Sequence, residues 1–143
     1  MKKKDESYKD LGRNYPTLKH FRLSEFDCPT EEGSGENMCP KFLQKLDNAR
    51  EKAKTAFHIN SGYRTPAHNT KVGGVRNSSH MNIPCNAADI AVKDGRQRFL
   101  ILVSLMSEGF NRFGIGKNFI HADLDDTKNG GDKSPNVIWH YYK

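Results

Sequence analysis

Two long segments of the chain repeat their apolar residues at helical spacing. In residues 39–57, CPKFLQKLDNAREKAKTAF, apolar residues recur every three or four positions and a proline falls in the first turn, where its missing N–H is not needed. In residues 95–109, GRQRFLILVSLMSEG, the apolar stretch is closed by a glycine, which commonly follows the end of a helix. Residues 65–74 begin with Thr-Pro and end at two glycines. The pattern predicts three helices over these segments.

Shorter apolar runs between and after these segments are typical of strands. They are rich in Ile, Val, Phe and Tyr, and Gly, Asn or Asp bounds most of them. Residues 20–23, HFRL, are also strand-like and lead into a short helical turn at Ser24 and Glu25. A chain of helices and strands that ends in a run of strands favours an α+β domain, with a small antiparallel sheet packed by helices. The five predicted strands lie in residues 57–64, 87–92, 112–116, 119–125 and 137–142.

The length of the chain sets its domain organisation. It has 143 residues, of which 35% are hydrophobic, and this suits one domain with one small core. We expect residues 1–17 to be a flexible N-terminal tail and residues 18–143 to be the single folded domain. The longest apolar run, FLILVSLM, is too short to cross a bilayer, so no membrane partner is expected. The basic start lacks the apolar region of a signal peptide, which predicts synthesis in a cytosol.

Charge and cysteine content narrow the function classes. The formal net charge of +6 at pH 7 favours anionic partners, such as nucleic acid or bacterial cell-wall polymer, although a basic surface can also lack a specific partner. No arginine-rich helix, aromatic stacking motif or finger spacing of cysteines is present, which argues against nucleic acid. Cys28, Cys39 and Cys85 form no CxxC pair, so a thiolate zinc site is not expected. A bridge between Cys28 and Cys39 would close a glycine-rich loop, but free thiols are the better expectation in a cytosol.

The segment FIHADLD, residues 119–125, places two potentially functional side chains on one face of a predicted strand. Side chains alternate between the two faces of a strand, so His121 and Asp123 share one face with Phe119. The intervening residues are apolar and fit a buried face. An imidazole and a carboxylate two residues apart suit a metal ligand beside an acid/base group. The alternative is a half-exposed strand whose polar residues simply face solvent.

The segment NSSHMNIPCNAADIAV, residues 77–92, supplies two more candidate ligands. His80 lies in a loop after two serines, and Asp89 lies within the apolar run AADIAV. A carboxylate is costly to bury there unless it is paired or coordinates a cation. The alternative is that Asp89 caps a turn and that His80 is solvated.

Together these residues form a ligand set for a catalytic metal. His80, Asp89 and His121 give three zinc ligands and leave a fourth position for water, as in catalytic rather than structural sites. The metal would lower the pKa of that water and polarise a carbonyl. Asp123 is the candidate acid/base that moves the water's proton to the leaving amine, and His140 is a rival or an assistant for that role.

Arg64 is the candidate anion-binding residue. It follows an apolar strand at a glycine-containing turn, in SGYRTPAHN. A guanidinium in that place can grip a substrate carboxylate through two hydrogen bonds. The alternative is a surface ion pair.

The order of these motifs resembles a known family. INSGYRTPAHNTKVGGVRNSSH, then AADIAV, then GFNRFGIGKNFIHADLD, then VIWHYY are together similar to the M15 family of zinc peptidases, above all to its small phage and prophage branch. That family includes D-alanyl-D-alanine carboxypeptidases and endolysins that cut peptidoglycan peptides. The likeness runs from about Phe21 to Tyr142 and implies the α+β fold shared by D-Ala-D-Ala peptidases and the hedgehog signalling domain.

The resemblance also implies roles for single residues. His80 and Asp89 match the family's SxH…AxD ligands, and His121 matches its third ligand. Arg64 matches an arginine thought to bind the carboxylate of the substrate. Ser79 would lie beside the metal loop, where its hydroxyl could bind substrate or a ligand.

Two departures from the family pattern stand out. The family usually has seven residues from His to Asp with a glycine between them, whereas here the separation is nine and MNIPCN has no glycine. The loop must bulge, with Cys85 either near the metal or packed as a small apolar residue. Many relatives also place a Glu three residues before the last His, where this chain has Asn118. The H-x-D arrangement, common in this branch, makes Asp123 the replacement.

The expected function is that of a monomeric zinc peptidase acting on peptidoglycan stem peptides. A chain without a signal peptide fits a phage lysin that a holin releases to the wall, and its positive charge would help it adhere there. A second reading is a recycling peptidase of a bacterial cytosol. A third is a non-catalytic wall-binding or phage structural module that keeps the metal, motivated by Asn118 and the longer loop.

Overall fold

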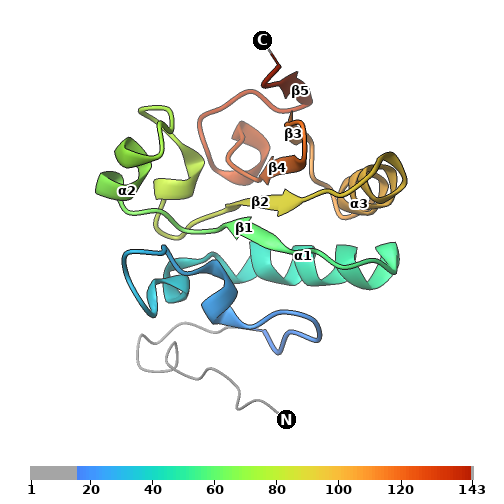
Figure 1. Ribbon diagram of the computed structural model, residues 1–143, viewed down its shortest axis with the longest axis horizontal. Coiled ribbons are helices and arrows are strands. Elements are labelled where there is room, and N and C mark those ends of the chain that lie inside the picture. The colour runs from blue at the N-terminus through green and yellow to red at the C-terminus, as the bar shows by residue number, and fades with distance from the viewer. Residues whose placement is uncertain (1–15, 143) are drawn as a thin grey trace.

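The computed structural model describes residues 16–142, which form an α+β domain as the sequence predicts (Figure 1). The three predicted helices and the five strands predicted between residues 57 and 142 are present, each somewhat shorter than its sequence segment. Short 3₁₀ turns lie between several of them. The elements are α1 Pro40–Ala53, β1 Ile59–Ser61, α2 Pro66–Lys71, β2 Ala87–Ala91, α3 Gly95–Ser107, β3 Arg112–Ile115, β4 Phe119–Asp123 and β5 Val137–His140.

Local sequence explains where the helices begin and end. Pro40 occupies the first turn of α1, and Lys54 ends the helix in a left-handed conformation. The Thr65 side chain caps α2 by accepting a hydrogen bond from the N–H of His68. The Asp94 side chain caps α3 in the same way, and Gly109, with φ +90°, follows its end. Helices α1 and α3 pack against each other and against the sheet, and their buried residues join one hydrophobic core.

The sheet is mixed rather than wholly antiparallel. Its strand order is β1-β2-β4-β3-β5, and every neighbouring pair is antiparallel except β3 and β5. The parallel pair arises because the segment 124–136 carries the chain from the end of β4 to the edge of the sheet beside the start of β3. There Val137 donates its N–H to the carbonyl of Asn111, so β5 must run in the direction of β3. The predicted antiparallel sheet is therefore corrected at this one edge.

The two faces of the sheet have different tasks. Ile90, Phe113, Ile120 and Ala122 point to the face covered by the helices and are at most 2% exposed. The opposite face carries a row of residues paired side by side across four strands. This row is Asp89 on β2, His121 on β4, Gly114 on β3 and Trp139 on β5. The alternation predicted for residues 119–125 is confirmed over residues 119–123, where β4 ends.

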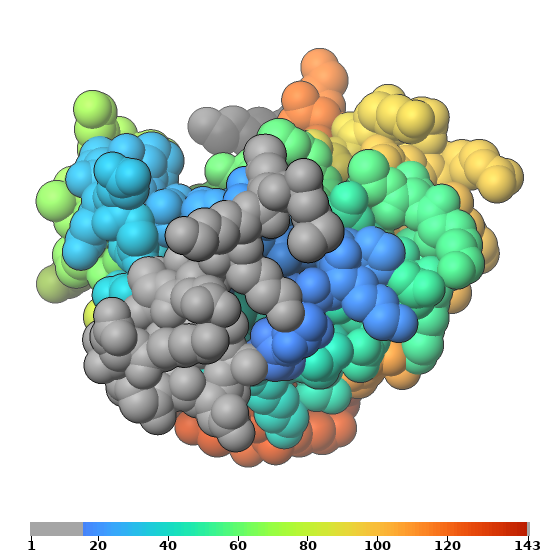
Figure 2. All heavy atoms as spheres, turned by 90° about the horizontal axis from the view of Figure 1, so that it is seen from below, coloured from blue at the N-terminus to red at the C-terminus, as the bar shows by residue number. Residues whose placement is uncertain are grey.

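Residues 20–23 do not form the predicted strand. Only Leu23 enters regular structure, in a 3₁₀ turn at Leu23–Phe26 that matches the turn expected there. The backbone N–H groups of Lys19 and His20 instead donate to the Asp47 carboxylate on α1, at 2.9 Å each. Figure 2 shows this blue segment lying beside the teal residues of α1. A carboxylate of the helix thus satisfies backbone groups that a neighbouring strand would otherwise bind.

The predicted N-terminal tail falls almost wholly outside the described residues. The structure describes no residue before 16, so the boundary at residue 17 stays a prediction. Within residues 16–142, no helix has the length and apolar content needed to cross a bilayer.

Candidate metal centre

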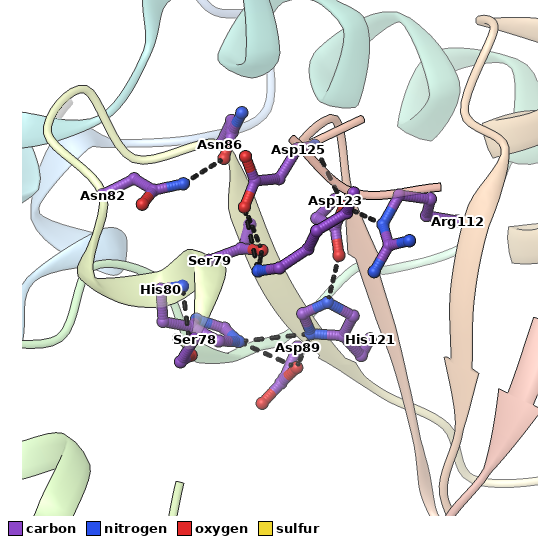
Figure 3. A network of polar contacts seen from close by, with 12 residues as sticks. Ser78, Ser79, His80, Asn82, Asn86, Asp89, Arg112, His121, Asp123 and Asp125 are labelled. Atoms are coloured by element: carbon purple, nitrogen blue, oxygen red, sulfur yellow. Dashed lines mark hydrogen bonds and ion pairs between the residues drawn. The ribbon is translucent and has the colours of Figure 1, made fainter. Parts of the chain in front are cut away.

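Three donor side chains converge on the face of the sheet away from α1 and α3 (Figure 3). Nε2 of His80 lies 3.2 Å from Oδ1 of Asp89 and 3.3 Å from Nδ1 of His121. Nδ1 of His121 lies 2.9 Å from the same Asp89 oxygen. Asp89 and His121 are directly opposite each other in the β2–β4 ladder, and the 3₁₀ turn Ser79–Met81 brings His80 to them. The structure thus brings the three predicted ligands together.

A backbone carbonyl fixes the His80 ring. Nδ1 of His80 lies 2.6 Å from the carbonyl oxygen of Gly62, which can only accept, so Nδ1 carries the hydrogen. The Ser78 side chain accepts from the N–H of His80 and caps its turn. Burial lowers the pKa of His80 and keeps the ring neutral, against the hydrogen bond to Asp89. The free lone pair, on Nε2, therefore points at the other two donors.

Arg64 holds the Asp89 carboxylate from its other side. Its Nη2 donates to Oδ2 of Asp89 at 3.1 Å, while Nε and Nη1 donate to Ser61 and Asn69. Burial opposes the charge on Asp89, but the hydrogen bond from His121 and the nearby His80 ring outweigh it and lower the pKa of the carboxyl. Arg64 is thus adjacent to the candidate ligands, where the sequence predicts an anion-binding residue, and three of its N–H groups are bonded within the chain.

Asp123 holds the His121 ring. Its Oδ2 lies 2.7 Å from Nε2 of His121, and its Oδ1 accepts from Nε of Arg112 at 2.7 Å and from the N–H of Asp125 at 3.0 Å. The carboxylate is 1% exposed. Burial opposes its charge, yet its hydrogen bond with His121 lowers the pKa of Asp123. This is the carboxylate–histidine arrangement that sets tautomer and ring orientation in metal sites.

The donor set fits a divalent metal ion. Because Nε2 of His121 gives its hydrogen to Asp123, the atom left facing Asp89 and His80 is Nδ1. Three acceptor atoms within 4.8 Å of one another repel each other unless a proton or a cation lies between them. Without metal, a proton fills this need: burial disfavours charge on His121, but hydrogen bonds with Asp123 and Asp89 raise its pKa to about 9. A metal ion would take the place of that proton.

Comparison with known proteins identifies the family. The family model described as Peptidase M15 matches residues 19–123, which is most of the chain and includes all three donors. The chain belongs to the Peptidase M15 family. No match was found among the curated proteins.

In this M15 chain the His80–Asp89 loop, which was expected to bulge, places Cys85 in the core and not at the candidate metal centre. The loop turns inward at Cys85, whose N–H donates to Asn37 and whose carbonyl accepts from the N–H of Cys39. Cys85 is fully buried, and burial raises the pKa of its thiol to about 12. Cys85 therefore packs in the core, which is one of the two roles left open by the sequence. All three described cysteines are free thiols.

Ser79 is occupied by contacts within the protein. Its hydroxyl donates to Oδ2 of Asp125 at 2.8 Å and accepts from Nζ of Lys133 at 2.8 Å. Lys133 also donates to Asp125 at 2.9 Å and to the carbonyl of Asn77 at 2.7 Å. These bonds tie the segment 124–136 to the turn that carries His80.

A cavity of about 510 Å³ opens in front of the three donors. Its lining includes all of the donors, their partners Arg64 and Asp123, and also Arg112 and Lys133. Phe119, Trp139 and Tyr141 form an aromatic side to it, with ring centroids of Phe119 and Tyr141 5.3 Å apart and those of His121 and Trp139 5.6 Å apart. A second cavity, of about 440 Å³, lies beside it and shares Asn77, Ser78 and Lys133 as lining.

The structure does not bring His140 to the donors. Trp139 and Tyr141 line the cavity, so strand alternation turns His140 away. His140 is exposed, accepts at Nδ1 from the N–H of Tyr142, and stacks on the Tyr142 ring. Sequence reasoning missed Trp139, Tyr141, Arg112 and Lys133 as cavity residues. The alternation of side chains along VIWHYY could have predicted that Trp139 and Tyr141 share one face of the strand.

Proposed function

We propose that this M15 peptidase is zinc-dependent and hydrolyses amide bonds in peptidoglycan stem peptides. The observation that carries the proposal is the convergence of His80, Asp89 and His121 at one side of a cavity, each held from behind by a further group. Two imidazoles and one carboxylate are a common ligand set of catalytic zinc. Bound there, zinc would lower the pKa of a water molecule and polarise the substrate carbonyl.

The groups that contact the three ligands from behind fix the orientation of the ligand side chains. The Gly62 carbonyl and Asp123 set the tautomers of the two rings, and Arg64 prevents Asp89 from rotating. The predicted acid/base role of Asp123 stays a prediction. Its three hydrogen bonds and its burial favour a positioning role through His121.

The charges around the cavity support a peptide substrate that carries carboxylates. Arg64, Arg112 and Lys133 all line it. A guanidinium has five N–H groups, so Arg64 retains two beyond its three bonds inside the chain. We propose that these bind a carboxylate of the stem peptide. The net charge of +6 would add long-range attraction to an anionic wall.

The test combines metal analysis with digestion of purified peptidoglycan sacculi. Zinc content and released fragments are measured for the unaltered protein, for His121→Ala and for His140→Ala, whose histidine lies outside the cavity. We expect one zinc ion per chain and fragment release for the unaltered protein and for His140→Ala, and neither for His121→Ala. Soluble muropeptides, tested beside sacculi, separate a lysin from a recycling peptidase.

A second candidate function is a wall-binding or phage structural module that keeps the metal without catalysis. Among the described residues that line the cavity, the only carboxylates are Asp89 and Asp123, and both are engaged. The family resemblance also implies a Glu in many relatives at the position of Asn118. A zinc-loaded protein that adheres to sacculi and releases no fragment would favour this candidate.

A further inference from the structure

Gly114 leaves open a place beside His121 that two aromatic residues fill. Gly114 is paired with His121 on one side and with Trp139 on the other. A Cβ atom on Gly114 would lie 2.6 Å from the Tyr141 hydroxyl and 2.6 Å from Nε1 of Trp139. Any side chain larger than the hydrogen of glycine would therefore force Trp139 or Tyr141 to move. The Tyr141 hydroxyl therefore lies over the sheet at the position next to a candidate metal ligand.

The main chain and the indole hold the Tyr141 phenol in this place. The N–H of Tyr141 donates to the carbonyl of Ile115, which extends the pairing of β5 with β3 by one residue. The indole N–H of Trp139 is hydrogen-bonded to the phenol oxygen. Because an indole can only donate, the phenol oxygen is the acceptor. Within residues 16–142, the phenol hydrogen itself has no acceptor partner.

The other charged donors around the cavity already make hydrogen bonds within the chain, although Arg64 and Arg112 each keep N–H groups beyond those bonds. Arg112 donates to Asp123 and to the carbonyl of Ser134. The three hydrogens of Lys133 match its three acceptors. Tyr141 differs from these charged donors in being an uncharged donor that lies over Gly114, the residue paired with the candidate ligand His121. Burial raises the pKa of the phenol, and the charges of Asp89 and Asp123 add to the rise against the Trp139 hydrogen bond, so the hydrogen stays on its oxygen.

We propose that Tyr141 is a catalytic residue that donates a hydrogen bond to the substrate oxygen as it becomes negative. In the hydrolysis, the oxygen of water forms a bond to the carbonyl carbon and the C=O π electron pair moves to the carbonyl oxygen. The phenol of Tyr141 stabilises this oxygen without giving up its proton. The pair then re-forms the C=O bond, the C–N bond breaks, and the amine leaves with a proton from the attacking water. This role rests on the proposed function, and Tyr141 lies beyond the segment 19–123 that the family model matches.

The test compares Tyr141→Phe with Tyr142→Phe. Tyr142 is a matched control because its hydroxyl donates to the carbonyl of Gly116 and it does not line the cavity. Removing one donor from a site of this kind lowers kcat by about 10²- to 10³-fold. We expect that loss for Tyr141→Phe, with KM and zinc content unchanged, and no loss for Tyr142→Phe.

A second readout does not depend on turnover. A phosphinate analogue of the stem peptide carries a negative oxygen where the reacting carbonyl would develop one, and calorimetry measures its Kd. Tyr141→Phe should weaken this analogue at least tenfold while leaving the affinity for the cleaved peptide product unchanged. If the unaltered protein hydrolyses wall peptide and Tyr141→Phe is within threefold of it in kcat, this inference fails alone. If the unaltered protein cuts no wall peptide, the proposed function fails and the inference falls with it.

Discussion

The substitution Asp123→Asn should change which nitrogen of His121 carries the hydrogen. Oδ1 of Asp123 accepts from Arg112 and from the N–H of Asp125, so an asparagine must keep its oxygen at that position. Its NH2 group then faces Nε2 of His121, where the carboxylate Oδ2 lies now at 2.7 Å. Because an amide NH2 can only donate, Nε2 must give up its hydrogen. The hydrogen moves to Nδ1, the atom that faces Asp89 and His80.

The resulting loss is one of metal affinity. Mutating a group that orients a ligating histidine typically weakens metal binding by about 10- to 100-fold, which corresponds to about 1.4–2.8 kcal/mol. We expect this loss for Asp123→Asn, measured as zinc Kd by competition with a chromophoric chelator. Activity should return when zinc is raised to saturation, because the substitution removes no group that reacts with substrate.

The control is Asp126→Asn. Asp126 is also fully buried, but it binds the backbone and side chain of Asn129 and touches none of the donors. The zinc affinity of the Asp126→Asn variant should equal that of the unaltered protein. If Asp123→Asn binds zinc with unchanged affinity and is inactive at saturating zinc, the positioning argument is refuted and the acid/base role predicted from the sequence is supported.

Three further predictions concern pH, space and stability. The pKa of His121 is raised from 6.5 to about 9, so the bonds of its protonated ring stabilise the metal-free fold. This stabilisation is fully present below pH 6.5 and is lost as the pH rises through about 9. The Tm of chelator-treated protein should therefore fall over that pH range relative to the Tm of zinc-loaded protein. If the two plots of Tm against pH run parallel, the raised pKa of His121 is contradicted. Gly114→Ala should displace the Trp139 and Tyr141 side chains from within 2.6 Å and lower hydrolysis with zinc content intact; full activity would show that their placement is unimportant. Leu46→Ala, in the core at 0% exposure, should lower the free energy of unfolding in urea by about 2–5 kcal/mol, and a loss under about 1 kcal/mol would show that the core closes around it.

Much of the fold could be predicted because local patterns determine it. The apolar spacing of α1 and α3 and the alternation of β4 are properties of neighbouring residues, and the structure confirms them. The parallel pairing of β5 was not predictable in this way, because it depends on the path of the segment 124–136 across the sheet. The absence of a strand at residues 20–23 depends on Asp47, a residue of α1 that sequence proximity does not connect to them.

The candidate site divides along the same line. His80, Asp89 and His121 were found through motifs and through the cost of burying a carboxylate, and the structure brings them together. The partners of Asp123 were not evident, because Arg112 reaches it from the neighbouring strand β3. The imidazole of His140 suggests a role in the site, but the alternation of β5 turns Trp139 toward the cavity and His140 away from it.

The central claim is that the zinc-loaded chain breaks amide bonds of peptidoglycan stem peptides. The most direct test is mass analysis of the fragments that zinc-loaded protein releases from purified sacculi, beside the same digestion with His121→Ala. The account predicts fragments with a new stem-peptide terminus for the unaltered protein and none for the variant. Zinc-loaded protein that releases no such fragment, or equal release by His121→Ala, would contradict it.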